Sequence, residues 1–113
     1  MNLTIEYNFS HVLIGVGEVL DVRVAPDLKS ELTSISDDVD ENIILDLNKC
    51  KDCNVSGLSI ILLMNRLCKK AGGMFVLTGL NSTIERMIKN SQIDSLLTIT
   101  KTVEEAISLI EKS

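Results

Sequence analysis

The amino-acid sequence predicts a single α/β domain spanning residues 1–113, with a mixed sheet of four to five strands and about four helices. In the second half of the chain, short apolar runs typical of buried strands alternate with longer segments of helical periodicity. This alternation indicates parallel strands joined by helical crossovers. Hydrophobic residues make up 45% of the chain, which at this length is enough for one core without disulfide bonds.

The first part of the chain is expected to fold as a β-hairpin followed by a helix. Residues 3–7 alternate apolar and polar side chains, as a half-buried strand does, and residues 11–17 give a second strand after a turn-like break at 8–10. Residues 25–35 then change period and are expected to be helical, because Pro26 suits a first helical turn. The apolar face of that helix would consist of Leu28, Leu32 and Ile35.

The central part is expected to contain a buried strand and a long helix. Residues 42–48 are a compact apolar run bounded by polar residues, the pattern of a strand covered on both faces. A helix is expected from about Gly57 to Lys70, and it should pack deeply because it is apolar over much of its circumference. Gly72 and Gly73 supply its stop.

The last third is expected to add a strand, a helix, an edge strand and a closing helix. Residues 74–79 form another buried run. Ser82 and Thr102 each precede a glutamate by three residues, which is the capping-box pattern of a helix start. The short apolar piece 95–100 between these two helices is expected to be an edge strand.

The composition argues against several classes of function. The formal net charge is −5, whereas nucleic-acid binding needs clustered Lys and Arg. The acidic run at residues 37–41 fits a solvated loop. The first ten residues lack the pattern of a secretion signal, and no run of eighteen apolar residues is present. We therefore expect a cytoplasmic location, no nucleic-acid partner and no direct membrane insertion.

The three cysteines are expected to be small apolar fillers. Cys50 and Cys53 have C-x-x-C spacing, but zinc needs about four ligands. Cys68 and His11 are the remaining candidates, and they form no second close pair. A thioredoxin-like site would have its first cysteine at a helix start, whereas here even the second one precedes it. Redox chemistry at this pair stays as a third hypothesis; no metal, cofactor or catalytic residue is predicted, and Asp46 and His11 are interpreted as structural.

The stretch CNVSGLSIIL, which begins at Cys53, puts Ser56 where a strand gives way to a helix. Backbone N–H groups are unpaired at a helix start, and the helix dipole favours negative charge there. In one interpretation Asn54 or Ser56 caps the helix. In the other, Ser56 accepts a phosphate group, which adds about −1.5 to −2 charges.

Three segments together resemble a STAS domain, as found in bacterial anti-sigma factor antagonists. The segment that begins GEVLD, residues 17–32, is similar to the family's G-x-(L/V)-D segment and the alanine-proline helix start after it. Residues 43–73 are similar to its buried strand, D-S-S-G loop and long helix ending in a glycine pair. Residues 75–107 look like its next strand, short helix, leucine-rich turn and closing helix. The resemblance covers almost the whole chain.

The resemblance implies a phosphorylation site at Ser56. In the family, the serine or threonine just before the loop glycine accepts phosphate from a partner anti-sigma kinase, and here that residue is Ser56. The acidic residue of the G-x-(L/V)-D segment corresponds to Asp21. The loop departs from the family pattern, because Asn54 stands for its usual aspartate and Val55 for its first serine. Loss of that carboxylate is expected to alter kinase recognition or phosphate turnover.

The expected function is a regulatory binding module without enzymatic activity. Its partners would be an anti-sigma factor of the serine-kinase type and a serine phosphatase, and phosphate on Ser56 would break the complex. Partner contacts are expected at Asp21, Asn54, Val55, Gly57 and Leu58. The alternative is a non-phosphorylated STAS accessory subunit of a lipid- or anion-transport complex, which the altered loop favours. Open sheet edges would allow weak self-association.

Overall fold

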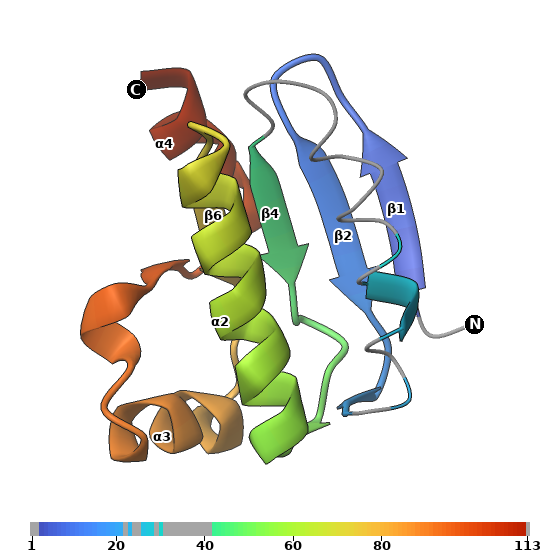
Figure 1. Ribbon diagram of the computed structural model, residues 1–113, viewed down its shortest axis with the longest axis vertical. Coiled ribbons are helices and arrows are strands. Elements are labelled where there is room, and N and C mark those ends of the chain that lie inside the picture. The colour runs from blue at the N-terminus through green and yellow to red at the C-terminus, as the bar shows by residue number, and fades with distance from the viewer. Residues whose placement is uncertain (1–2, 22, 24–25, 29, 31–41, 113) are drawn as a thin grey trace.

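The computed structural model describes residues 3–21, 23, 26–28, 30 and 42–112, and its centre is a five-stranded sheet (Figure 1). Neighbouring strands follow the order β1-β2-β4-β6-β7, with β1 and β2 antiparallel and every other pair parallel. The predicted α/β class with a mixed sheet is confirmed. The strands are β1 (Leu3–Tyr7), β2 (Val12–Val16), β4 (Ile43–Asp46), β6 (Phe75–Thr78) and β7 (Thr98–Thr100).

The N-terminal hairpin is also confirmed. Leu3 pairs with Val16 and Tyr7 with Val12, and the turn is closed by the Asn8 N–H, which donates to the His11 carbonyl oxygen at 2.9 Å. Strand β1 covers the five residues whose alternating pattern predicted it. It forms one edge of the sheet, where only one of its two sides is paired.

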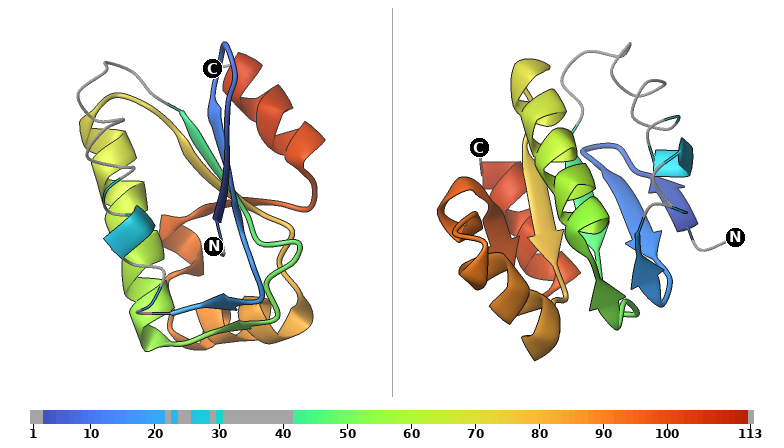
Figure 2. Two further views of the ribbon diagram at one scale, coloured as in Figure 1. Left: turned by 90° about the vertical axis from the view of Figure 1, so that its right-hand side faces the viewer. Right: turned by 60° about the horizontal axis from the view of Figure 1, so that its bottom comes forward.

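Helices cover both faces of the sheet. Helices α2 (Val55–Lys70) and α3 (Ser82–Asn90) pack on one face, and α4 (Val103–Lys112) packs on the other (Figure 2). The helical residues 26–28 and 30 lie on the same side as α2, where Leu28 is fully buried. The prediction of about four helices is therefore confirmed.

The central strands β4 and β6 are apolar at consecutive positions because both of their faces are covered. Ile44 and Val76 belong to the core cluster against α4, whereas Leu45 and Leu77 belong to the larger cluster on the side of α2. Successive side chains of a strand point to opposite faces, so a strand covered on both faces needs apolar residues at consecutive positions.

Helix α2 begins earlier than expected. Its first residue is Val55, two residues before Gly57, because Asn54 is the N-cap. The Asn54 Oδ1 atom accepts the Gly57 N–H at 3.0 Å. Of the two caps considered from the sequence, Asn54 is therefore correct, and Ser56 lies inside the first turn.

The two later helices differ in how well their starts were predicted. The expectation that Ser82 caps α3 is wrong, because Asn81 occupies that position and its Oδ1 accepts the Ile84 N–H at 2.8 Å. Both residue types are good caps, so their order alone does not decide between them. Thr102 was predicted correctly: its Oγ1 accepts the Glu105 N–H at 3.2 Å at the start of α4.

The C-terminal edge of the sheet is the short strand β7, which pairs only with β6, so the edge strand expected within residues 95–100 is confirmed. A single 3-10 turn, η1 (Asp94–Leu96), leads into it. The acidic run 37–41 lies outside the described residues. The same holds for the expected helix 25–35 apart from residues 26–28 and 30.

Candidate functional site at the start of helix α2

A two-stranded ribbon beyond the carboxyl ends of β2 and β4 positions the start of α2. Its strands β3 (Val19–Leu20) and β5 (Asp52–Cys53) pair in parallel, and Leu20 lies opposite Cys53. The Asn54 N–H then donates to the Leu20 carbonyl oxygen at 3.4 Å. Each strand has only two residues, which is too short to show a period, so the sequence pattern does not reveal the ribbon.

Gly57 is the point where α2 packs closest against this ribbon. A Cβ atom on Gly57 would overlap the Leu20 carbonyl oxygen and would lie 2.7 Å from the Cys53 Sγ. Backbone atoms of a paired strand cannot move aside easily. A glycine is therefore needed here for close approach, and not for any unusual backbone angle.

The residues expected to contact a partner divide into an exposed group and a buried group. Asn54 and Val55 are exposed, with 75% of Val55 accessible, and Ser56 is half-buried. Gly57 and Leu58 are buried, and Leu58 belongs to the core. The accessible surface at the start of α2 thus consists of Asn54, Val55 and Ser56.

The first turn of α2 differs from those of α3 and α4 in its charge. It contains no Asp or Glu, whereas α3 carries Glu85 there and α4 carries two glutamates. The N–H groups of Val55 and Ser56, and the Ser56 hydroxyl, have no hydrogen-bond partner among the described residues. Free N–H groups and the helix dipole together favour an anion at this position.

Asp21 follows β3 directly and is held by an arginine. The Arg23 guanidinium donates from Nη2 to Asp21 Oδ2 at 2.8 Å and from Nε to the same oxygen at 3.0 Å, and the Arg23 backbone N–H donates to Oδ1 at 2.9 Å. These hydrogen bonds keep the pKa of Asp21 below its usual value. The sequence interpretation overlooked Arg23, although its D-x-R spacing from Asp21 is a local signal for such a pair.

The cysteines behave as the predicted fillers. Cys50, Cys53 and Cys68 are all buried free thiols. Burial raises the pKa of Cys53 and that of Cys68 to about 12, and it also raises the pKa of Cys50. The thiolate is the reactive form of cysteine, so redox work at neutral pH is disfavoured. The described residues also contain no group of three His, Cys, Asp or Glu side chains able to hold a metal ion.

Two further polar residues have the structural roles expected for them. His11 is buried, and its ring nitrogens lie 3.0 Å from the Ser10 Oγ and 3.3 Å from the Asn8 Nδ2. Asp46 Oδ1 accepts the Asn48 N–H at 2.9 Å just after β4.

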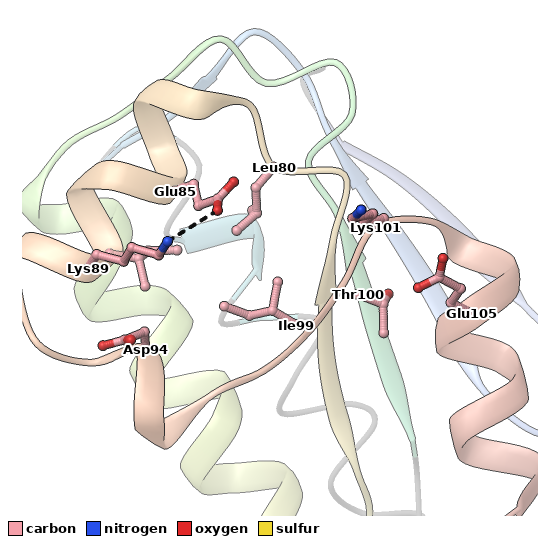
Figure 3. A pocket seen from close by; sticks show the side chains of 9 residues that line it. Leu80, Glu85, Lys89, Asp94, Ile99, Thr100, Lys101 and Glu105 are labelled. Carbon is pink, nitrogen blue, oxygen red and sulfur yellow. Dashed lines mark ion pairs between the residues drawn. The ribbon is translucent and has the colours of Figure 1, made fainter.

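A cavity of about 640 Å³ lies elsewhere, between α3, β7 and the start of α4 (Figure 3). Leu80, Ile88 and Ile99 give it an apolar floor. Its rim carries charges of both signs, including the Lys89–Glu85 ion pair at 3.6 Å. No residue of the α2 start lines this cavity, so it is separate from the site around Ser56.

A known family matches almost the whole chain. The family model of the STAS domain matches residues 2–106, and the chain therefore belongs to the STAS domain family. No helix within the described part of the chain is long and apolar enough to cross a membrane.

Solved structures of particular STAS proteins are similar to this chain. An anti-sigma factor antagonist from Mycobacterium paratuberculosis is 18% identical over 96% of this chain and 92% of that chain, with a TM-score of 0.83. The Bacillus cell fate determinant SpoIIAA in its phosphorylated form is 18% identical over 96% and 98%, with a TM-score of 0.75. A sulfate transporter family protein from Wolinella succinogenes is 17% identical over 88% and 83%, with a TM-score of 0.77. At these identities the likeness shows the fold alone.

Proposed function

We propose that this chain, as one STAS domain over residues 1–113, is an antagonist of an anti-sigma factor and is controlled by phosphorylation of Ser56. The observation that carries the proposal is the half-buried Ser56 hydroxyl, which has no partner among the described residues, in a helix turn without acidic side chains. The family membership and the similarity to anti-sigma factor antagonists support the same assignment.

The proposed switch is a change of charge at a docking surface. Without phosphate, the exposed Val55 and the polar atoms beside it contact a cytoplasmic anti-sigma factor and release its sigma factor. That partner, acting as a kinase, transfers the γ-phosphoryl group of ATP to the Ser56 Oγ: the bond from the γ-phosphorus to the ADP oxygen breaks, a P–O bond to Ser56 forms, and ADP and the hydroxyl proton are released. The new dianion resists desolvation in the interface and breaks the complex. A serine phosphatase hydrolyses the phosphate ester and resets the domain, which itself catalyses no step.

The altered loop is compatible with this switch. Asn54 keeps the capping function of an aspartate, because its Oδ1 atom accepts the Gly57 N–H. It carries no negative charge, so it does not repel a phosphate two residues away. Val55 adds exposed apolar surface, which favours docking by the unphosphorylated form.

Phosphorylation can be tested directly by incubating the chain with ATP and the serine kinase encoded by a neighbouring gene, followed by mass spectrometry. We expect one phosphate on Ser56 and none on a Ser56→Ala variant. Ser59→Ala is the matched control, because Ser59 is an exposed serine one turn further along α2. We also expect Ser56→Glu to weaken the complex. An active kinase that modifies another residue, or a Ser56→Glu variant that binds as tightly as the wild type, would refute the proposal.

The alternative function is a constitutive accessory subunit of a lipid- or anion-transport complex. The similarity to a sulfate transporter family protein and the departure of Asn54 and Val55 from the phosphorylation loop favour it. In that case the chain would co-purify with membrane transport components and would not be phosphorylated at Ser56. Weak self-association through the β1 edge is also proposed, and sedimentation at increasing concentration would reveal it.

A further inference from the structure

The last residue of β3 contacts the start of α2. The parallel register pairs Val19 with Asp52 and Leu20 with Cys53, and Asp21 is the residue that follows Leu20. The Leu20 carbonyl oxygen contacts the Asn54 N–H and sits against Gly57. Ser56 lies in the chain between Asn54 and Gly57, the two residues that the Leu20 carbonyl oxygen meets, and Asp21 with its bound arginine follows Leu20.

Arg23 is an exposed cation held two residues after Asp21, close in the chain to the contact between β3 and α2. Its side chain is 71% exposed, whereas that of Asp21 is 13% exposed, so the guanidinium covers the carboxylate and faces solvent. Asp21 uses Nε and one N–H of Nη2, which leaves donors of the five-donor guanidinium available. The other charged side chains of the ribbon and its flanks are Glu18, Lys51 and Asp52.

We propose that Arg23 is a two-position receptor, bound to Asp21 when Ser56 is unmodified and to the phosphate group when Ser56 is phosphorylated. This inference rests on the proposed function and specifies which side chain of the domain binds the phosphate at that site. A phosphate has more charge than a carboxylate and three acceptor oxygens, and it forms bidentate pairs with guanidinium. The free N–H groups of Val55 and Ser56 add further donors on the same side.

The exchange would enlarge the electrostatic change at the docking surface. When Arg23 leaves, the Asp21 carboxylate loses its counterion. Phosphorylation would then add the phosphate anion at Ser56 and also leave the Asp21 carboxylate without a counterion. A partner that binds the neutral Asp21–Arg23 pair would lose that contact as well.

The test uses the full chain with phosphoserine inserted at position 56 during translation, so that no kinase is required. The second pKa of the phosphate is measured by phosphorus NMR. We expect Arg23→Gln to raise that pKa by about half a unit, the size that an exposed ion pair supports. Arg66→Gln is the matched control, because Arg66 is exposed on α2 and lies about 15 Å further along the helix axis. It should leave the pKa unchanged.

A second readout follows Arg23 itself. Its Nε–H resonance should move when phosphate is present and return when the phosphate is removed. Arg23→Lys should recover only part of the effect on the phosphate pKa, because lysine lacks the planar guanidinium that binds two oxygens at once. An Arg23→Gln variant with the wild-type phosphate pKa, or a resonance that phosphate leaves in place, would overturn the inference. Failure of a kinase to modify Ser56 would instead overturn the proposed function, so the two failures are distinguishable.

Discussion

The first turns of α2 and α3 share the same cap and the same position for a hydroxyl. Asn54 and Asn81 each accept the N–H three residues later, at 3.0 and 2.8 Å, and Ser56 and Thr83 each occupy the second helical position. The two turns then differ. The third position is Gly57 in α2 and a core isoleucine in α3, and only α3 has an acidic residue in its first turn.

This difference indicates which helix start can respond to an added anion. The first turn of α3 contains Glu85, which balances its positive pole, whereas the first turn of α2 contains no acidic side chain. The α2 start is also fixed against β3 through Gly57, so a charge added at Ser56 acts on a rigid surface. The four predictions below would break or sharpen this comparison, from the largest expected effect to the smallest.

The close packing at Gly57 should be the most sensitive feature. We expect Gly57→Ala to lower the free energy of unfolding by about 1–3 kcal/mol, because the added methyl overlaps the Leu20 carbonyl oxygen. Urea denaturation measures the loss. Ser59→Ala, at an exposed position of the same helix, should change stability by less than about 0.5 kcal/mol. If Gly57→Ala were more stable than the wild type, as helix propensity alone predicts, the packing argument would fail.

The two caps should be unequal despite their similar geometry. Asn54→Ala should cost about 1 kcal/mol, the usual loss of a cap. Asn81→Ala should cost about 2 kcal/mol, because the Asn81 Nδ2 also donates to the carbonyl oxygens of Cys50 and Lys51 at 3.2 Å each. Equal losses in urea denaturation would mean that these two extra hydrogen bonds contribute nothing.

A glutamate at the second helical position should stabilise α2 more than it stabilises α3. We expect Ser56→Glu to stabilise the free domain by about 0.3–1 kcal/mol at low salt. Thr83→Glu should stabilise the domain by less than Ser56→Glu does, because Glu85 already lies in the first turn of α3. The difference should shrink in 1 M salt, where the screening length is about 3 Å. Thermal denaturation at both salt concentrations is the measurement, and a larger gain for Thr83→Glu would contradict the comparison.

The Asp21–Arg23 pair should have the smallest effect of the four, which is a change in how stability depends on pH. The pKa of Asp21 is lowered in the folded state, so its contribution is present above the unfolded value of about 4 and is lost as the pH falls through the folded pKa. The difference in melting temperature between wild type and Asp21→Asn should therefore be constant from pH 7 to 5 and narrow below about pH 4. Asp94→Asn, which removes an exposed carboxylate outside any ion pair of the described residues, should show no such narrowing.

Much of the fold was predictable because its signals are local. The alternation of residues 3–7 marked β1, and the uninterrupted apolar runs at 42–48 and 74–79 marked strands covered on both faces. Helix starts were less certain. Asn81 and Ser82 are both good caps, and the choice between them depends on where the preceding chain leaves the sheet.

The candidate site was predictable only in part. The strand-to-helix pattern and the family resemblance led to Ser56 and Asp21. They did not lead to Arg23, and they named Leu58 as a partner contact without revealing that its side chain packs in the core. Exposure at a helix start depends on what packs against each side of the helix, and that information comes from residues distant in the chain.

By itself, the sequence determined the order and type of the main elements, since hydrophobic period and helix capping are properties of neighbouring residues. Only the tertiary structure decided that two-residue strands more than thirty positions apart pair beneath α2, and hence why position 57 must be a glycine. The physical reason is that this contact depends on the approach of one backbone to another, which leaves no periodic mark on either segment.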